Sequence, residues 1–292
     1  MTRHPVATIR FLATILLVSL LAAPTLADSH VRAVRLSSIE GDVQIDRNTG
    51  GGFEKAFINI PLIEGARIHT GVDGRAEIEL ENGSTIRLAP ETTTVFSELS
   101  LRESGAKVTH VTLLEGTAYV TYREDKQDEF RLAFAREVLA LAEPARLRVQ
   151  MKDAEATAAV FKGKAEIDGA SGHAALGKGQ SISFDLASHD QYALADKVEE
   201  DPSDDWDKDQ EQYHDKYLSK KTSAYANGYG ASDLNYYGSF SNLPGYGMLW
   251  QPYFVGAGWD PFMDGAWAWY PGAGYVWVSA YPWGWTPYRC GS

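Results

Sequence analysis

The chain has 292 residues, with 39 acidic and 27 basic side chains and a formal net charge of −12. This balance argues against a nucleic-acid-binding protein, because contacts to phosphates depend on Lys and Arg. A single cysteine, Cys290, excludes an internal disulfide framework and a zinc site built from cysteines. Hydrophobic residues make up 44% of the chain, which is enough for a folded core.

Residues 1–27 have the layout of a secretory signal peptide. Arg3 and Arg10 precede an apolar run over 11–23, and small residues lead up to Ala27. The run is shorter than the ~20 apolar residues that span a bilayer. We therefore expect cleavage after Ala27, export of the protein, and a mature chain without a transmembrane segment.

Residues 28–195 are expected to form a β domain. Short runs rich in β-branched residues recur along this region, and turn signals separate them. Asn82-Gly83, between the runs at 75–80 and 85–88, is the strongest short hairpin signal in the chain. The pattern predicts a mainly β fold, which could be an antiparallel sandwich, a roll or a strand solenoid.

The run at 75–80 alternates apolar and charged residues, which predicts a strand with one buried and one solvated face. Glu77 and Glu79 fall on the predicted solvated face. A pair of carboxylates can serve acid–base catalysis, but alternating surface charge is the simpler explanation here.

Seven short segments of this region, in order, resemble the FecR-like domain, which is named for the periplasmic part of an iron-dicitrate sensing regulator. These segments are Gly41–Val43, Leu62–Thr70, Gly74–Leu80, Asn82–Leu88, Leu114–Thr117, Phe161–Ala165 and Leu176–Gln180. The resemblance implies a protein of the periplasm or outer envelope of a Gram-negative-type bacterium. The regulator also carries a cytoplasmic anti-sigma segment and a membrane helix ahead of the domain. Only ten residues precede the apolar run here, so we expect the domain without that segment.

Residues 196–221 form an acidic linker with ten acidic side chains and five lysines. Trp206, Tyr213 and Tyr217 are spaced as an aromatic stripe on one side of a short helix. We expect a solvated linker helix that rests on a neighbouring domain. A calcium site is the alternative, because clustered carboxylates suit hard cations, but the run lacks the ligand pattern and central glycine of an EF-hand loop.

Residues 222–292 hold twenty aromatic side chains and one basic residue, Arg289. The runs 266–270 and 275–278 alternate at period two around a Pro-Gly turn, which predicts an aromatic hairpin in a small β module. The region resembles an uncharacterised Trp-rich module that follows FecR-like domains, most distinctively in Pro282–Tyr288. We expect the module to be incomplete at its end, with an exposed Cys290 thiol.

Most of these aromatic side chains must form a core, because a soluble protein does not tolerate so large an apolar surface. We expect two or three to remain exposed as a flat platform, on which sugar rings or a protein partner would stack. Nucleic-acid bases are excluded, because their binding needs interleaved basic residues. The candidate binding residues are Trp250, Trp259, Trp267, Trp269, Trp277, Trp283, Trp285 and Tyr288.

The sequence contains no recognisable catalytic constellation, cofactor motif or metal-ligand spacing. We therefore expect a non-enzymatic, exported binding or scaffold protein, with an envelope protein or a cell-wall glycan surface as its partner. The FecR-like domain would contact a protein, and the aromatic module would dock on the surface. The alternative is a sensory protein related to metal-siderophore signalling that lacks the anti-sigma segment. A cell-wall hydrolase is a third class, supported by location alone.

Overall fold

The computed structural model describes residues 32–123, 127–187, 191–218 and 229–289. The expected signal peptide, its cleavage point after Ala27, and Cys290 lie outside the described residues. Residues Val31–Ser292 form one compact unit. The expectation of a mainly β protein is confirmed.

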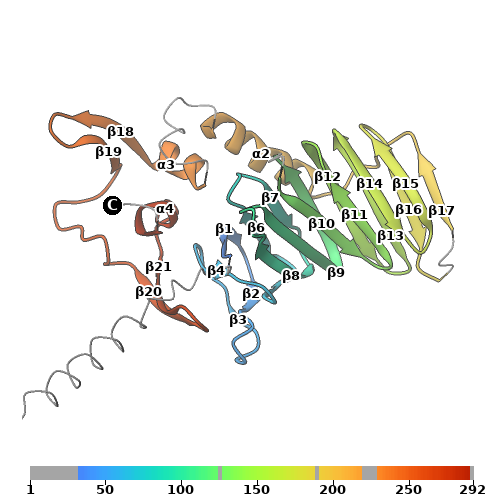
Figure 1. Ribbon diagram of the computed structural model, residues 1–292, viewed down its shortest axis with the longest axis horizontal. Coiled ribbons are helices and arrows are strands. Elements are labelled where there is room, and N and C mark those ends of the chain that lie inside the picture. The colour runs from blue at the N-terminus through green and yellow to red at the C-terminus, as the bar shows by residue number, and fades with distance from the viewer. Residues whose placement is uncertain (1–31, 124–126, 188–190, 219–228, 290–292) are drawn as a thin grey trace, which may run out of the picture. The chain divides into compact units, whose positions relative to one another are not determined.

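Seventeen strands form one continuous hydrogen-bonded sheet, which a single long strand folds into two facing layers (Figure 1). Layer A contains, in spatial order, β3 (Glu54–Lys55), β2 (Val43–Asp46), β5 (Arg67–Thr70), β8 (Thr93–Leu101), the first half of β9 (Lys107–Tyr122), β10 (Glu129–Phe134), β11 (Glu137–Leu141), β14 (Lys164–Gly169) and β15 (Gly172–Gly177). Layer B contains β4 (Pro61–Leu62), β1 (Val34–Glu40), β6 (Arg75–Glu79), β7 (Thr85–Leu88), the second half of β9, β12 (Ala145–Lys152), β13 (Glu155–Lys162), β16 (Ser181–Asp185) and β17 (Tyr192–Ala195). The structure therefore realises the sandwich among the predicted architectures. All these pairs are antiparallel except β9 with β10, which is parallel.

Strand β9 passes from one layer to the other through an irregularity near Gly116. Odd-numbered residues such as Val111 and Leu113 join the main hydrophobic core from its first half, whereas even-numbered residues such as Ala118 and Val120 join it from its second half. An extra residue at a β-bulge produces this change of parity and bends the strand. Gly116 has a φ of 87°, and a Cβ there would lie 2.4 Å from Thr92 Oγ1. Glycine is therefore required at the bend.

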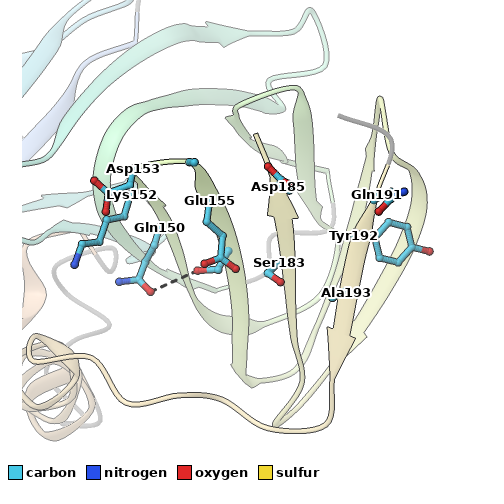
Figure 2. Close-up of a pocket in the computed structure, with 11 residues that line it drawn as sticks. Gln150, Lys152, Asp153, Glu155, Ser183, Asp185, Gln191, Tyr192 and Ala193 are labelled. Carbon is cyan, nitrogen blue, oxygen red and sulfur yellow. Dashed lines mark hydrogen bonds between the residues drawn. The ribbon is translucent and has the colours of Figure 1, made fainter. Parts of the chain in front are cut away.

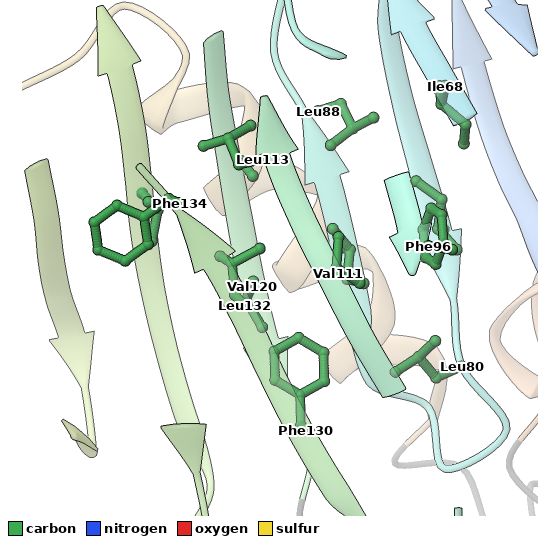
Figure 3. Close-up of a cluster of buried hydrophobic side chains, with 14 of the residues drawn as sticks. Ile68, Leu80, Leu88, Phe96, Val111, Leu113, Val120, Phe130, Leu132 and Phe134 are labelled. Atoms are coloured by element: carbon green, nitrogen blue, oxygen red, sulfur yellow. The ribbon is translucent and has the colours of Figure 1, made fainter. Parts of the chain in front are cut away.

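The space between the layers holds one continuous hydrophobic core (Figure 3). Phe96 and Val111 enter it from layer A, and Leu88 and Val120 enter it from layer B; all four are fully buried. The predicted hairpin at Asn82-Gly83 is confirmed as the β6–β7 turn, with Ile78 opposite Ile86. Inward alternation in each strand thus supplies the core of the sandwich.

A helix and a small module follow the sandwich. Helix α2 (Asp204–Leu218) lies within the predicted acidic linker. Next come α3 (Ala231–Tyr237), a hairpin of β18 (Gly238–Leu243) and β19 (Gly247–Pro252), a second hairpin of β20 (Gly265–Tyr270) and β21 (Gly274–Ser279), and α4 (Trp285–Arg289). The second hairpin is the aromatic hairpin predicted from the sequence. Within the described ranges, no helix is both long and apolar enough to cross a membrane.

Candidate binding surface

Helix α2 lies against layer B (Figure 1), and its carboxylates bond to arginines on the outer face of that layer. Asp207 is fully buried and accepts a hydrogen bond of 2.8 Å from Nη1 of Arg87 on β7. It also accepts hydrogen bonds from Nε (2.9 Å) and Nη2 of Arg146 on β12. One turn earlier, Asp204 accepts from Arg148 Nη1 at 2.5 Å. The helix is therefore held by a row of buried and half-buried ion pairs.

The predicted aromatic stripe is formed, but it is not the side that docks on the sandwich: the rings of Tyr213 and Tyr217 lie 5.5 Å and 5.1 Å from the ring of Tyr236 on α3. Trp206, Tyr213 and Tyr217 are only partly buried, whereas Asp207 and His214 are the buried residues of the helix. The predicted helix is confirmed, but the side that docks on the sandwich is charged, because the outer face of layer B presents arginines rather than apolar side chains.

Glu77 and His214 form the centre of this contact. His214 Nε2 lies 2.9 Å and 3.0 Å from the two carboxylate oxygens of Glu77, and its Nδ1 lies 2.9 Å from Ser232 Oγ. Burial alone would raise the pKa of Glu77, but the charges of His214 and Arg87 outweigh it and hold that pKa well below its ordinary value. Burial opposes protonation of His214, yet the charge of Glu77 and its hydrogen bond raise the pKa of the imidazole.

A second group of buried charges joins β1 and β6 to the C-terminal module. Arg35 is fully buried; its Nη1 lies 3.0 Å from Glu79 Oε2, and its Nη2 donates to Asp233 on α3. Asp233 also accepts a hydrogen bond of 2.6 Å from the Tyr213 hydroxyl on α2. The backbone N–H of Gly230 donates to Glu79 at 3.1 Å.

Glu77 and Glu79 were predicted to be solvated, and that prediction was wrong. Their side chains are 2% and 1% exposed. The alternation of the strand was interpreted correctly, but α2 and α3 cover the charged face, and arginines neutralise it. Both carboxylates are committed to ion pairs, Glu77 with Arg87 and His214, and Glu79 with Arg35.

The eight candidate aromatic residues divide between a core and a surface. Trp283 and Trp285 are buried, with 5% and 3% exposure. Trp250, Trp259 and Tyr288 are half-buried against the small core around Trp283. Trp283 stacks on Tyr281 at 4.8 Å between ring centroids, and Trp250 lies 5.0 Å away. This cluster replaces the aliphatic core that the module lacks, and its buried members offer no face to a ligand.

The remaining candidates lie together on one face of the β20–β21 hairpin. Trp267 is opposite Trp277, and Trp269 is opposite Tyr275. Trp267, Trp269 and Tyr275 are 60%, 48% and 71% exposed, and Trp277 is half-buried between Trp267 and Phe262. We call these four residues, Trp267, Trp269, Tyr275 and Trp277, the aromatic face. Sequence reasoning did not select Tyr275, although its period-two spacing from Trp277 could have placed it there.

The opposite side of the same hairpin is fixed to the sandwich. Ala268, Tyr270 and Val278 join the main hydrophobic core. The Tyr270 hydroxyl donates to Pro61 O at 2.6 Å, and Arg47 Nη1 donates to Trp269 O at 2.8 Å. The aromatic face is thus held on a rigid support, which lowers the entropy lost when a ligand stacks on it.

Comparison with known families agrees with this division of the chain. Residues 66–166 match the family model described as FecR protein. The chain carries a FecR domain. Residues 231–292 match a family of unknown function, DUF6600. The FecR match runs from β5 to β14, and the DUF6600 match begins at α3, so the Glu79–Arg35–Asp233 contacts connect the FecR domain to the DUF6600 module.

Comparison with solved structures gives a more distant likeness. Two crystal structures of a "putative anti-sigma factor" from Parabacteroides distasonis ATCC 8503 align with TM-scores of 0.39 and 0.38, each at 16% identity. The alignments cover 45% of this chain and 59% of the solved chains. No curated protein matches the chain significantly.

An open cavity of about 750 Å³ lies along β12, β13, β16 and β17 of layer B (Figure 2). Gln150, Glu155, Ser183, Asp185 and Tyr192 line it, among others. In the part of the chain that the structure describes, no three His, Cys, Asp or Glu side chains are grouped to hold a metal ion. Four acidic side chains of α2 are instead paired with arginines: Asp204, Asp207, Glu211 and Asp215.

Proposed function

We propose that the chain is a non-enzymatic binding protein of the bacterial envelope, which docks on a saccharide surface through its aromatic face. The observation that carries the proposal is the set of four aromatic side chains on one exposed side of a hairpin whose other side is packed into the core. A contiguous patch of exposed aromatic side chains on one face of a protein indicates a binding site.

A saccharide ligand suits the chemistry of this face. The C–H faces of pyranose rings stack on aromatic planes, and the face itself carries no charged side chain. The hydroxyl of Tyr275, together with indole N–H groups, could hydrogen-bond to sugar hydroxyls. Export of the protein, which the composition of residues 1–27 predicts, would bring this face to the cell wall.

The test is co-sedimentation with purified sacculi, using residues 28–292, which contain the whole compact unit Val31–Ser292. We expect the double substitution Trp267→Ala/Trp269→Ala to reduce binding by about tenfold or more, with the unfolding midpoint unchanged. Tyr192→Ala, which removes another exposed aromatic side chain on β17, is the matched control and should bind like the wild type. Equal binding by the double variant and the control would refute the proposal.

A second candidate function rests on the FecR match at residues 66–166. In this alternative the protein is a sensory or regulatory component of the envelope, and its FecR domain contacts a protein partner. Removing residues 222–292 would not test it cleanly, because the Arg35 and Glu79 side chains would lose their buried partners. The double variant serves instead: binding to outer-membrane vesicles that survives Trp267→Ala/Trp269→Ala but is lost when protease removes the vesicle proteins would favour this alternative.

A further inference from the structure

The two hairpins of the DUF6600 module are repeats of one another. Each has two six-residue strands with the same register and a Pro-Gly turn of equal length. Gly238 corresponds to Gly265, and in both a Cβ would lie 2.5 Å from the ring of the corresponding tryptophan, Trp250 or Trp277. The hairpins therefore share one packing plan.

The two hairpins differ in whether one side is packed against the rest of the protein. Tyr270, near the turn of the second hairpin, is 2% exposed because it packs into the main core. Its counterpart in the first hairpin, Leu243, is 47% exposed. The face that fixes β20–β21 to the FecR domain is thus open in β18–β19.

The tip of the β18–β19 hairpin is apolar on both sides. Leu243 and Leu249 lie on one side, Met248 lies on the other, and Tyr246 occupies the turn at 77% exposure. The Tyr246 N–H donates to Leu243 O at 3.0 Å, and Gly245 has a φ of 84°, so the turn is closed and well formed. We call Leu243, Tyr246, Met248 and Leu249 the apolar tip.

The surroundings of the apolar tip carry no charge. Residues 234–259 contain no Asp, Glu, Lys or Arg, although the whole chain has a formal net charge of −12. In the same stretch, Tyr253 and Phe254 are also exposed, the latter completely. Protein interfaces carry a polar rim, whereas contact with lipid selects uncharged residues with aromatic side chains near the headgroups.

From these observations we propose that the apolar tip inserts into the interfacial region of a lipid bilayer. A protein groove would cover only one side of the hairpin, whereas lipid would surround both sides. Lipid therefore fits the tip better, because Leu243 and Leu249 lie on one side and Met248 lies on the other. Insertion is shallow, because the outer backbone groups of a two-stranded hairpin need water or headgroups as partners. The contact is separate from the saccharide-binding aromatic face and does not depend on it.

The test is flotation of residues 28–292 with vesicles of phosphatidylcholine, and in parallel with vesicles containing phosphatidylglycerol. We expect binding to phosphatidylcholine and weaker binding to the anionic vesicles, because the protein is acidic. Tyr246→Glu should reduce partitioning by about tenfold, since a carboxylate resists transfer from water to the interface. Val72→Glu is the matched control, because Val72 is 79% exposed on the FecR domain and the substitution adds the same charge.

Three results would overturn the proposal: no binding of the wild type to either vesicle, equal loss in both glutamate variants, or no loss in Tyr246→Glu. Circular dichroism and the unfolding midpoint establish that both variants fold. The Trp267→Ala/Trp269→Ala variant should bind vesicles like the wild type, but it should no longer bind sacculi. Failure of the lipid contact is therefore distinguishable from failure of the saccharide proposal.

Discussion

Replacing Asp207 tests whether α2 is held by its buried ion pairs. The substitution Asp207→Ala removes a carboxylate that accepts hydrogen bonds from Arg87 and Arg146. Arg87 is fully buried and cannot be rehydrated in place, whereas Arg146 is 20% exposed and can turn toward water. Removing one partner of a buried pair costs about 3–5 kcal/mol, because the remaining charge stays desolvated.

The lower end of that range applies here. Arg87 keeps Glu77 at 2.7 Å and Glu211 at 3.1 Å, so its charge is still neutralised after the substitution. We expect a loss of about 3 kcal/mol in the free energy of unfolding. At this chain size, that loss corresponds to a fall of about 6 °C in Tm.

The assay is urea unfolding of residues 28–292, followed by circular dichroism, with Asp209→Ala as the matched control. Asp209 lies on the same helix but is exposed, so its removal should change the free energy of unfolding by less than about 0.5 kcal/mol. The difference between the two variants should persist at high salt, because buried pairs are poorly screened. If Asp207→Ala is no more destabilising than Asp209→Ala, the ion pairs do not hold the helix.

Three further predictions concern other parts of the molecule. The pKa of His214 is raised above its ordinary value of 6.5. The protonated imidazole therefore contributes fully to the free energy of unfolding below pH 6.5, and this contribution is lost as pH rises through the folded pKa. His214→Gln should make the free energy of unfolding less dependent on pH between pH 6 and pH 9. Gly116→Ala should cost about 1–3 kcal/mol in denaturant unfolding, because an alanine Cβ would meet Thr92 at a positive φ; a neutral result would mean that β9 can bend without glycine. Trp283→Ala should cost about 3–5 kcal/mol, and tryptophan fluorescence should report loosening of the DUF6600 module; unchanged stability would show that Trp283 is not part of its core.

The strands and turns of the FecR domain could be predicted because their causes are local. The alternation of apolar and charged residues over 75–80 and the Asn82-Gly83 turn specify a hairpin locally, without contacts to distant parts of the chain. The change of parity in β9 was not predicted, since its cause is a bulge that also depends on the contact of Gly116 with Thr92. Such a contact joins residues that are distant in the sequence.

The burial of Glu77 and Glu79 could not be deduced from their own strand. Their partners His214 and Arg35 lie on other elements, and a charged face becomes a buried one only when a complementary face docks on it. The sequence did contain a signal, because Asp204, Asp207, Glu211 and His214 are spaced three or four apart along one side of a helix. The aromatic spacing of Trp206, Tyr213 and Tyr217 on the same helix is a more conspicuous pattern and conceals this signal.

In the DUF6600 module, the presence of a few exposed aromatic side chains could be predicted, but not which rings they are. Both hairpins carry a tryptophan at the corresponding position, Trp250 and Trp277, and composition does not separate them. Their surroundings do: Ala268 and Val278 face the FecR domain, whereas their counterparts in the first hairpin, Ser241 and Gln251, are polar and exposed. Packing of the second hairpin therefore directs its aromatic face outward. The first hairpin has no such apolar face along its length, and only its tip is available for an apolar contact.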